Sequence, residues 1–262
     1  GLGYYSRARN IHRTAKIVLN EYEGKFPQDF KNLVELPGIG PSTAGAILSL
    51  AFELPGIILD GNVKRVIARF KGITNPIDNN ETQKEVKSFA ETFLPKNSFR
   101  EYSQGIMDLG SLLCKPKNPL CNSCPVSKNC QALKLSIQEK IPFKKPSKPK
   151  KEKKIDWLLI YSKNKILLQR NDSKGIWKNL WLFPDKNALS KDNISLLEKK
   201  ESLPEIIHNL SHQKLSISTV KYKIKNKDRL KIDRSSSVWV SKADSVKMGM
   251  PKPIKEILEN YL

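Results

Sequence analysis

The stretch LPGIGPSTAGAILSL, residues 36–50, sets two glycines around one isoleucine and follows them with a proline and an apolar run. Glycine lets the backbone turn tightly and come close to a ligand, and proline is favoured in the first turn of a helix. The stretch therefore predicts a sharp turn between two helices. Backbone amides at the start of the second helix are suited to hold a phosphate, with the hydroxyls of Ser42 and Thr43 as further donors. A plain corner between packed helices is the alternative.

A second glycine motif, LDGNVKRV at residues 59–66, places Asp60 where another helix should begin. The amides and the positive end of a helix favour an ionised carboxylate there, so Asp60 is a candidate for chemistry on a bound ligand. An ordinary helix cap is the alternative, because aspartate is common at such positions. Lys64 and Arg65 follow on the same helix, and we expect them to contact phosphate.

All four cysteines fall between residues 114 and 130, with gaps of six, two and five residues. Four thiolates on one loop can surround a metal centre, and no other cysteine competes for them. Two disulfides are disfavoured by the crowding on one loop and by the cytosolic character of the chain. The spacing alone suits zinc and an iron–sulfur cluster equally well. The predicted ligands are Cys114, Cys121, Cys124 and Cys130.

The overall charge points to a polyanionic partner. The 262 residues include 47 Lys and Arg against 26 Asp and Glu, which gives a formal charge of +21. Such a chain suits nucleic acid, although a merely solvating lysine surface is the alternative. No apolar run reaches the roughly 20 residues of a membrane span, and no secretory signal opens the chain. We therefore expect a cytoplasmic protein. The chain opens GLGYY without a methionine, and we expect it to be a piece of a longer protein.

The hydrophobic pattern divides the chain into two domains. Helical periodicity fills residues 1–139, starting with an apolar stripe of Ile11, Ala15, Val18 and Leu19. Residues 140–154, KIPFKKPSKPKKEKK, are basic and proline-rich, as expected of a linker. Residues 155–262 hold short β-rich runs and a final helix. The predicted architecture is an all-α domain, a basic linker and a smaller α+β domain.

Taken together, the motif GLGYYSRARN, the two glycine motifs and the cysteine spacing resemble the helix-hairpin-helix DNA glycosylases, and within them the MutY type that acts on adenine. The resemblance is strong over residues 1–140 and weak beyond. It implies that the hairpin amides hold a DNA phosphate, that the four cysteines hold a [4Fe–4S] cluster, and that Tyr4 wedges into the duplex. The implied DNA-binding residues are Leu36, Gly38, Gly40, Ser42, Thr43, Lys64 and Tyr4.

Two positions separate the branches of this superfamily. The endonuclease III branch has a Schiff-base lysine where this chain has Ser42, and Asp-Thr-His where it has Asp60-Gly61-Asn62. Both differences favour a monofunctional adenine enzyme, in which Asp60 stabilises the sugar cation and Asn62 supports it. The family glutamate that protonates adenine lies upstream of Gly1, so we expect this chain to be impaired in catalysis.

The second domain resembles the Nudix hydrolase MutT, which MutY-type proteins use to inspect 8-oxoguanine. GIWKNLWLFP at residues 175–184 and LSH at residues 210–212 carry this resemblance, with Leu210 where the family has phenylalanine. It implies that Gly175, Ser211 and His212 lie at the lesion. The glutamate-rich Nudix helix is missing between Pro184 and His208, so we expect no nucleotide pyrophosphatase activity.

The expected function is hydrolytic removal of adenine paired with 8-oxoguanine or guanine in double-stranded DNA, by a monomer with a [4Fe–4S] cluster. Two alternatives stay open. One is a thymine or uracil mismatch glycosylase of the same superfamily, which should not need residues 155–262. The other is a non-catalytic module that binds lesions, which the missing glutamate would favour.

Overall fold

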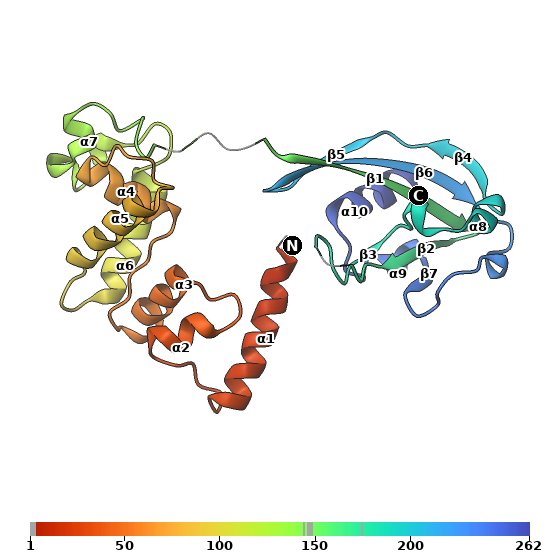
Figure 1. The fold of residues 1–262 in the computed structure, drawn as a ribbon, viewed down its shortest axis with the longest axis horizontal. Coiled ribbons are helices and arrows are strands. Elements are labelled where there is room, and N and C mark those ends of the chain that lie inside the picture. Colours follow the sequence, from red (N-terminus) through yellow and green to blue (C-terminus); the bar gives the residue numbers. More distant parts are fainter. Residues whose placement is uncertain (1–3, 144, 146–148, 174) are drawn as a thin grey trace. The chain divides into compact units, whose positions relative to one another are not determined.

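The computed structural model describes residues 4–143, 145, 149–173 and 175–262. The chain forms two compact units, residues 1–147 and residues 148–262 (Figure 1). Gly1–Gly3 of the GLGYY motif, and positions 144 and 146–148 of the expected linker, lie outside the described residues. No helix in the described part of the chain is long and apolar enough to cross a membrane.

The first unit is helical, as predicted. Its α-helices are α1 (Tyr5–Glu21), α2 (Phe30–Glu35), α3 (Pro41–Ala46), α4 (Gly61–Lys71), α5 (Asn80–Thr92), α6 (Phe99–Asp108) and α7 (Gln131–Lys134). Wider π-helical turns continue α3 and α6 over Ile47–Ala51 and Leu109–Leu113. One core cluster packs around α4 and α5, with Val63, Ile67 and Val86 at its centre. The other packs α1 against the α2–α3 hairpin around Leu33 and Ala44.

Helix α1 differs from the predicted burial. Val18 is buried, but Ile11 is 59% exposed and Leu19 is 67% exposed. The apolar stripe faces an open groove between α1 and the hairpin, which Phe26 also lines. Beside this stripe, the hydroxyl of the buried Thr14 donates to the carbonyl of Pro37 at 2.8 Å. This hydrogen bond helps to hold α1 against the hairpin.

The expected linker is shorter than its composition indicated. At its start, Ile141 is buried in the core around α4, and the carbonyl of Phe143 accepts from the amide of Ile77 at 2.9 Å. At its end, strand β1 begins at Lys151 and pairs with a distant strand from its first residue. Backbone pairing with residues far along the chain overrides the local basic composition, so residues 151–154 are strand.

The second unit is an α+β sheet domain, as predicted. Its strands are β1 (Lys151–Ser162), β2 (Lys165–Arg170), β3 (Trp181–Leu182), β4 (Glu198–Ser202), β5 (Ile206–Asn209), β6 (Gln213–Lys223) and β7 (Ser237–Ser241). The central pair, β1 and β6, is parallel, and the other pairs are antiparallel. The strand order is β3-β2-β1-β6-β4, with β5 also on β6 and β7 also on β2.

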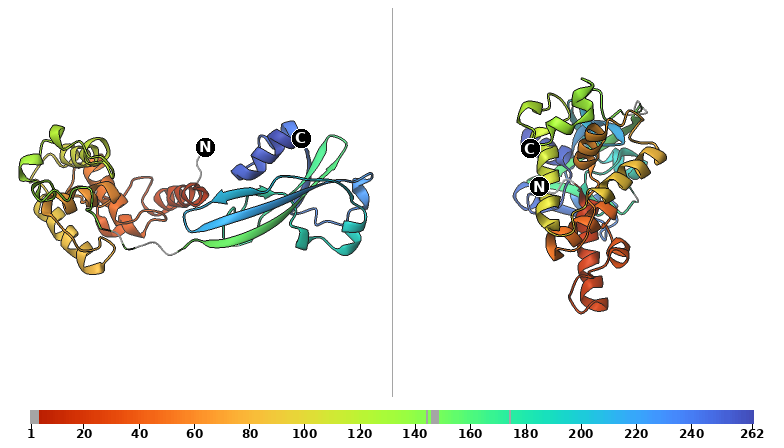
Figure 2. Two further views of the ribbon diagram at one scale, coloured as in Figure 1. Left: turned by 90° about the horizontal axis from the view of Figure 1, so that it is seen from above. Right: turned by 90° about the vertical axis from the view of Figure 1, so that its left-hand side faces the viewer.

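The α-helices in the described part of this unit are α8 (Lys191–Ser195), α9 (Lys242–Ser245) and α10 (Lys252–Tyr261). Helix α10 lies along one face of the sheet (Figure 2). It buries Ile254, Ile257 and Leu258, whose spacing at three and four residues places them on one side of the helix. Helix α8 spans only five residues and carries no glutamate, so the described residues between Pro184 and His208 hold no glutamate-rich helix.

Candidate functional site

The hairpin between α2 and α3 has the geometry that its glycines predicted. Gly38 adopts a φ of +85°, a left-handed conformation that glycine reaches without strain. The amide of Ile39 donates to the carbonyl of Leu36 at 3.0 Å and closes the turn. Leu36 is 3% exposed and anchors the turn in the core, while Gly38, Gly40 and Thr43 are exposed. The backbone of the turn and the start of α3 therefore face outward, where a phosphate has access.

Ser42 has a role that the sequence did not indicate. Its Oγ accepts a hydrogen bond from the amide of Leu59 at 3.1 Å. Leu59 immediately precedes Asp60, so this bond ties the first turn of α3 to the segment that carries the carboxylate. The hydroxyl keeps its own proton for a further partner.

Asp60 caps α4. Its Oδ1 accepts from the amides of Asn62 at 2.9 Å and Val63 at 2.8 Å. Both bonds fix the half-buried side chain in one orientation. Asp60 therefore caps the helix through Oδ1, and the same carboxylate is the candidate anion for chemistry on a ligand.

Arg65 does not face a phosphate, contrary to expectation. It is 7% exposed, and its Nε donates to the carbonyl of Cys114 at 2.7 Å. One Nη2 hydrogen bond goes to the carbonyl of Gly110 at 2.6 Å and another to Oδ1 of Asn62 at 2.9 Å. Burial lowers the pKa of the Arg65 guanidinium. Its carbonyl partners lie about fifty residues away in sequence, so no local pattern could show that this charge is buried.

Arg69, one turn further along α4, is 2% exposed and holds the same loop. Its Nε donates to the carbonyl of Ile141 at 2.8 Å, Nη1 to that of Lys115 at 2.7 Å and Nη2 to that of Pro116 at 3.1 Å. Sequence reasoning missed this residue. The pattern that could have identified it is the pair Arg65 and Arg69, one helical turn apart on the helix that begins after Asp60.

The four cysteines line one cavity, together with Arg69, Leu113, Leu120 and Gln138. Nη1 of Arg69 also donates to Sγ of Cys114 at 3.3 Å, and Sγ of Cys130 donates to the carbonyl of Arg69 at 3.5 Å. No three histidine, cysteine or acidic side chains in the described ranges are arranged to hold a single metal ion. The thiols are all free and half-buried.

Burial raises the pKa of the Cys121 and Cys124 thiols. The neighbouring thiols raise the Cys121 pKa further. The Cys124 pKa is partly offset by a hydrogen bond from the backbone of Val126. Burial therefore favours the neutral thiols of Cys121 and Cys124, and a bound metal would replace their protons.

Tyr4 and Lys64 lie at the surface of the first unit. Tyr4 is 62% exposed, and the guanidinium of Arg7 lies 5.4 Å from the centre of its ring. Lys64 is half-buried on α4.

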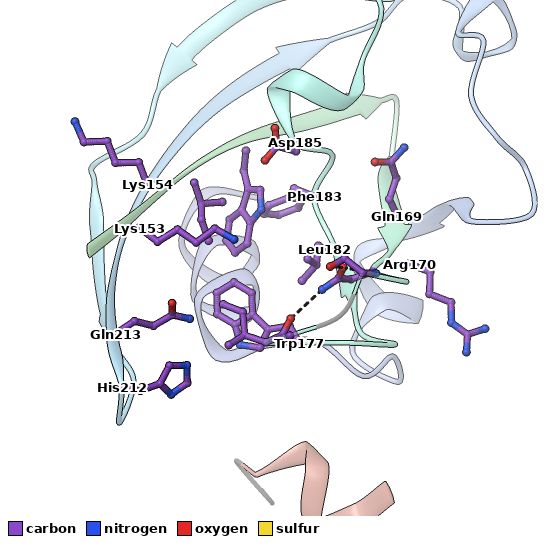
Figure 3. Close-up of a pocket in the computed structure, with 16 residues that line it drawn as sticks. Lys153, Lys154, Gln169, Arg170, Trp177, Leu182, Phe183, Asp185, His212 and Gln213 are labelled. Carbon is purple, nitrogen blue, oxygen red and sulfur yellow. Dashed lines mark hydrogen bonds between the residues drawn. The ribbon is translucent and has the colours of Figure 1, made fainter. Parts of the chain in front are cut away.

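In the second unit, two of the three expected lesion residues line a pocket of about 520 Å³ (Figure 3). Gly175 lines it with a φ of +121°, and an added Cβ would meet no atom within 4 Å. The backbone conformation alone therefore favours glycine there. His212 and Gln213 stand on one side of the pocket, while Lys154 and Arg170 point away from it (Figure 3).

The floor of this pocket is aromatic. Trp157 and Trp177 are nearly fully buried, with ring centres 5.7 Å apart, and Phe183 meets Trp157 edge-on at 6.0 Å. Trp177 and Asn179 both adopt positive φ, so the loop between β2 and β3 is held in an uncommon conformation. The stretch GIWKNLWLFP contains Trp177, Asn179 and Phe183, but the sequence indicated a role only for Gly175.

Ser211 and His212 are exposed at the tip of the β5–β6 hairpin. The amide of Leu210 donates to the carbonyl of Gln213 at 2.8 Å and closes the tip. Leu210 is half-buried, and its carbonyl accepts from Nζ of Lys150 at 2.7 Å. The tip presents the Ser211 hydroxyl to solvent next to the pocket that His212 lines.

Comparison with known proteins agrees with both units. Residues 21–50 match the helix-hairpin-helix motif, and residues 156–260 match the NUDIX domain family. The adenine DNA glycosylase of Buchnera aphidicola subsp. Schizaphis graminum is 37% identical over 268 residues, which span 100% of this chain and 77% of that protein. That of Buchnera aphidicola subsp. Baizongia pistaciae is 37% identical over 98% of this chain and 75% of that protein. The chain belongs to the adenine DNA glycosylase family.

Among solved structures, a thermostable thymine-DNA glycosylase is 33% identical, with a TM-score of 0.45 over 49% of this chain and 59% of that one. Endonuclease III in a non-covalent DNA complex is 30% identical, with a TM-score of 0.43 over 52% of this chain and 61% of that one. As an adenine DNA glycosylase family member, this chain combines a helix-hairpin-helix unit with a Nudix-like sheet unit. The first unit brings the hairpin, Asp60 and the cysteine loop together through Ser42 and α4.

Proposed function

We propose that this chain, as an adenine DNA glycosylase of base excision repair, hydrolyses the N-glycosidic bond of adenine paired with 8-oxoguanine or guanine in duplex DNA. The observation that supports this most is the hydrogen bond from the Leu59 amide to Ser42. This hydrogen bond fixes the position of the hairpin, which is the expected phosphate-binding site, relative to Asp60. A phosphate bound at the hairpin would thereby set the position of the nearby sugar relative to the carboxylate.

Asp60 is the group that would stabilise the reaction. Cleavage of a glycosidic bond passes through an oxocarbenium-like state, which an anion next to the sugar stabilises. The two amide bonds to Oδ1 hold Asp60 in place, so the carboxylate needs no reorganisation during the reaction. The adenine must leave the base stack before this bond is accessible.

The acid that protonates the leaving adenine is assigned to none of these 262 residues. Glu53 forms an ion pair with Arg100 at 2.7 Å, and Glu35 is exposed. Neither matches the family pattern. A positioned general acid contributes about 10²–10⁴-fold to such a step, so the rate of adenine release depends on that group.

Ser42 sets the reaction type. A serine at this position cannot form the Schiff base through which a lysine cleaves the DNA strand. The products should be free base and an intact strand with an abasic site. Incubation with an end-labelled duplex containing A:8-oxoguanine tests this: strand breaks should appear only after alkali. Breaks before alkali treatment, or a complex trapped by borohydride, would contradict the monofunctional assignment.

The cysteine cavity fits a [4Fe–4S] cluster. Four thiols line it, and an arginine N–H already meets one of the sulfurs at 3.3 Å. Bound there, the cluster would cross-link the loop and could accept or donate one electron. Arg65 and Arg69 hold the same loop from α4 through its carbonyls, so they transmit its position to the helix that Asp60 caps. Anaerobic purification should give about four irons per chain. Stoichiometric zinc without iron would contradict this assignment.

Lesion recognition is proposed for Gly175, Ser211 and His212 at the pocket of the second unit. The double variant Ser211→Ala, His212→Ala should lose about 1–3 kcal/mol of preference for 8-oxoguanine over guanine opposite adenine, the cost of a lost base-edge contact. Affinity for undamaged duplex should hold, because phosphate contacts supply it. The matched control is Ser218→Ala, His12→Ala, which changes an exposed serine and an exposed histidine elsewhere. Equal preference in both double variants would contradict the proposal.

We propose that the protein acts on DNA in the cytoplasm as a monomer, since the hairpin, Asp60 and the cysteines all come from one unit. A thymine or uracil glycosylase would release those bases from mismatches with guanine. A non-catalytic module would bind A:8-oxoguanine duplex and release no base.

A further inference from the structure

Gln138 contributes an unusual atom to the wall of the cysteine cavity. It follows α7 in the chain and lines the cavity with the four thiols and Arg69. Its Oε1 is buried and has no hydrogen-bond partner in the described structure. Buried oxygens without a partner are uncommon, because removing one from water without a compensating hydrogen bond is unfavourable. Because Gln138 lines the cysteine cavity, a group bound in the cavity is a candidate partner for its side-chain amide.

The sulfurs in the cavity determine whether the oxygen or the NH₂ group of the Gln138 amide should face them. Thiolates and sulfides only accept hydrogen bonds, so a metal-loaded cavity favours donors on its wall. Arg69 already supplies one, from Nη1 to Sγ of Cys114 at 3.3 Å. A glutamine carries an oxygen and an NH₂ group at the same distance from its backbone. Rotation by half a turn about the last torsion places Nε2 where Oε1 lies.

We propose that Gln138 is a positioning residue of the metal centre, which donates an N–H···S hydrogen bond from its side-chain amide to the iron–sulfur cluster held by the four cysteines. This rests on the proposed cofactor. A hydrogen bond to sulfur draws electron density from the cluster and stabilises its more negative, reduced state. Gln138 and Arg69 act on the cluster as a pair of donors from separate segments.

The experiment uses the full, iron-loaded chain bound to duplex DNA and the variant Gln138→Met, which keeps the length of the side chain and removes its donor. Iron content is measured first, so that failure of the proposed cofactor is seen separately from failure of this proposal. The midpoint potential of the cluster is then measured by voltammetry. We expect it to shift to more negative values in Gln138→Met. The control Gln83→Met, at an exposed position on α5, should leave it unchanged.

A second readout follows the hydrogen bond itself. Exchange into D₂O shifts Fe–S stretching bands in the resonance Raman spectrum when N–H groups bond to the sulfurs. This shift should be smaller in Gln138→Met than in the unchanged chain and in Gln83→Met. An iron-loaded Gln138→Met with the same potential and the same deuterium shift as Gln83→Met would overturn the proposal, and a water molecule would then be the partner of Oε1.

Gln138→Lys covers the case in which Gln138→Met does not retain iron, because lysine restores a donor on a chain of similar length. Retention of the cluster by Gln138→Lys, but not by Gln138→Met, would support a donor role. Loss of iron from both variants, with full iron in Gln83→Met, would show that Gln138 serves packing rather than donation and would overturn the proposal.

Discussion

Asp60 combines a structural and a chemical task in one carboxylate. Its Oδ1 accepts two amide hydrogen bonds at the start of α4, and the same charge is proposed to face the sugar. Asparagine is also a good helix cap and accepts the same bonds, so substitution can remove the charge without removing the cap. Stability and activity can therefore be separated at this position.

We predict that Asp60→Asn leaves the free energy of unfolding within about 0.5 kcal/mol, since the cap is kept. Adenine release should fall by about 10²–10³-fold, the usual loss when a preorganised electrostatic contact is removed. Urea unfolding and single-turnover base release measure the two effects. Asp60→Ala is the matched comparison and should lose stability as well, by about 1 kcal/mol. Undiminished release by Asp60→Asn would exclude Asp60 as the stabilising anion.

His208 should make stability depend on pH. It packs against the Trp177 ring with centres 5.9 Å apart, and burial lowers its pKa from the ordinary value near 6.5. Lys252 lowers this pKa further, whereas Glu256 raises it. The folded chain thus binds this proton less readily than the unfolded chain, so the contribution present above about pH 6.5 is lost as the pH falls through the folded pKa.

We therefore predict that the urea midpoint, followed by tryptophan fluorescence, decreases from pH 7.5 to pH 5 and that His208→Gln makes this decrease smaller. His12 is exposed, so His12→Gln should leave the decrease unchanged. The same pH slope in both variants would show that His208 titrates alike in the folded and unfolded chains.

For single residues, the sequence predicted those whose roles follow from a local pattern. The Asp60 cap follows from a local rule, and the cysteines follow from their spacing. Arg65 was predicted wrongly and Arg69 was missed, because charged residues are usually exposed and their partners here are carbonyls far along the chain. The pocket floor of Trp157 and Trp177 was missed because Trp157 lies on β1 and Trp177 in the loop between β2 and β3, so the fold rather than a local pattern brings the two rings together.

At the scale of elements, the contact between α3 and the segment before α4 is made by two glycines. A Cβ on Gly45 would lie 2.0 Å from the carbonyl oxygen of Ile57, and a Cβ on Gly56 would lie 2.2 Å from that of Gly45. Neither oxygen can move without moving the backbone. This close approach runs beside the Ser42–Leu59 bond, so it fixes the hairpin relative to Asp60.

Gly45→Ala should destabilise the chain by about 1–3 kcal/mol or more, because the added methyl group overpacks a backbone contact. Gly105 is the control: it lies exposed on α6, and a Cβ there meets no atom within 4 Å. Gly105→Ala should be neutral or stabilise by up to about 1 kcal/mol, since alanine is the better helix former. Equal unfolding midpoints for the two variants would contradict the close contact.

The sequence predicted most elements and missed where some begin. Hydrophobic periodicity identified the helices of the first unit, and residues 165–170 form β2 as expected. Residues 151–154 were assigned to the linker because they are nearly all lysine. They form strand because β6 pairs with them in parallel from Gln213 onward, and that partner lies about sixty residues away. Long-range pairing of this kind leaves no local signal.

For the whole molecule, the charge of +21 should govern binding to DNA. Each phosphate contact releases condensed counterions, so the logarithm of the affinity should fall linearly with the logarithm of the salt concentration. For about six contacts, the affinity for undamaged duplex should drop by about 10³-fold between roughly 50 and 200 mM salt. Fluorescence anisotropy at several salt concentrations measures this slope. A slope near zero would show that the basic surface only keeps the protein in solution.

The most direct test of the account is the identity of the base that this chain releases. Equal amounts of A:8-oxoguanine, A:G, T:G, U:G and undamaged A:T duplexes are mixed with excess iron-loaded protein, and the free bases are quantified by mass spectrometry. We expect adenine alone, drawn from the 8-oxoguanine duplex before the guanine duplex, and release about 10²–10³-fold slower with Asp60→Asn. Release of thymine or uracil, or the same adenine release by Asp60→Asn, would contradict the account.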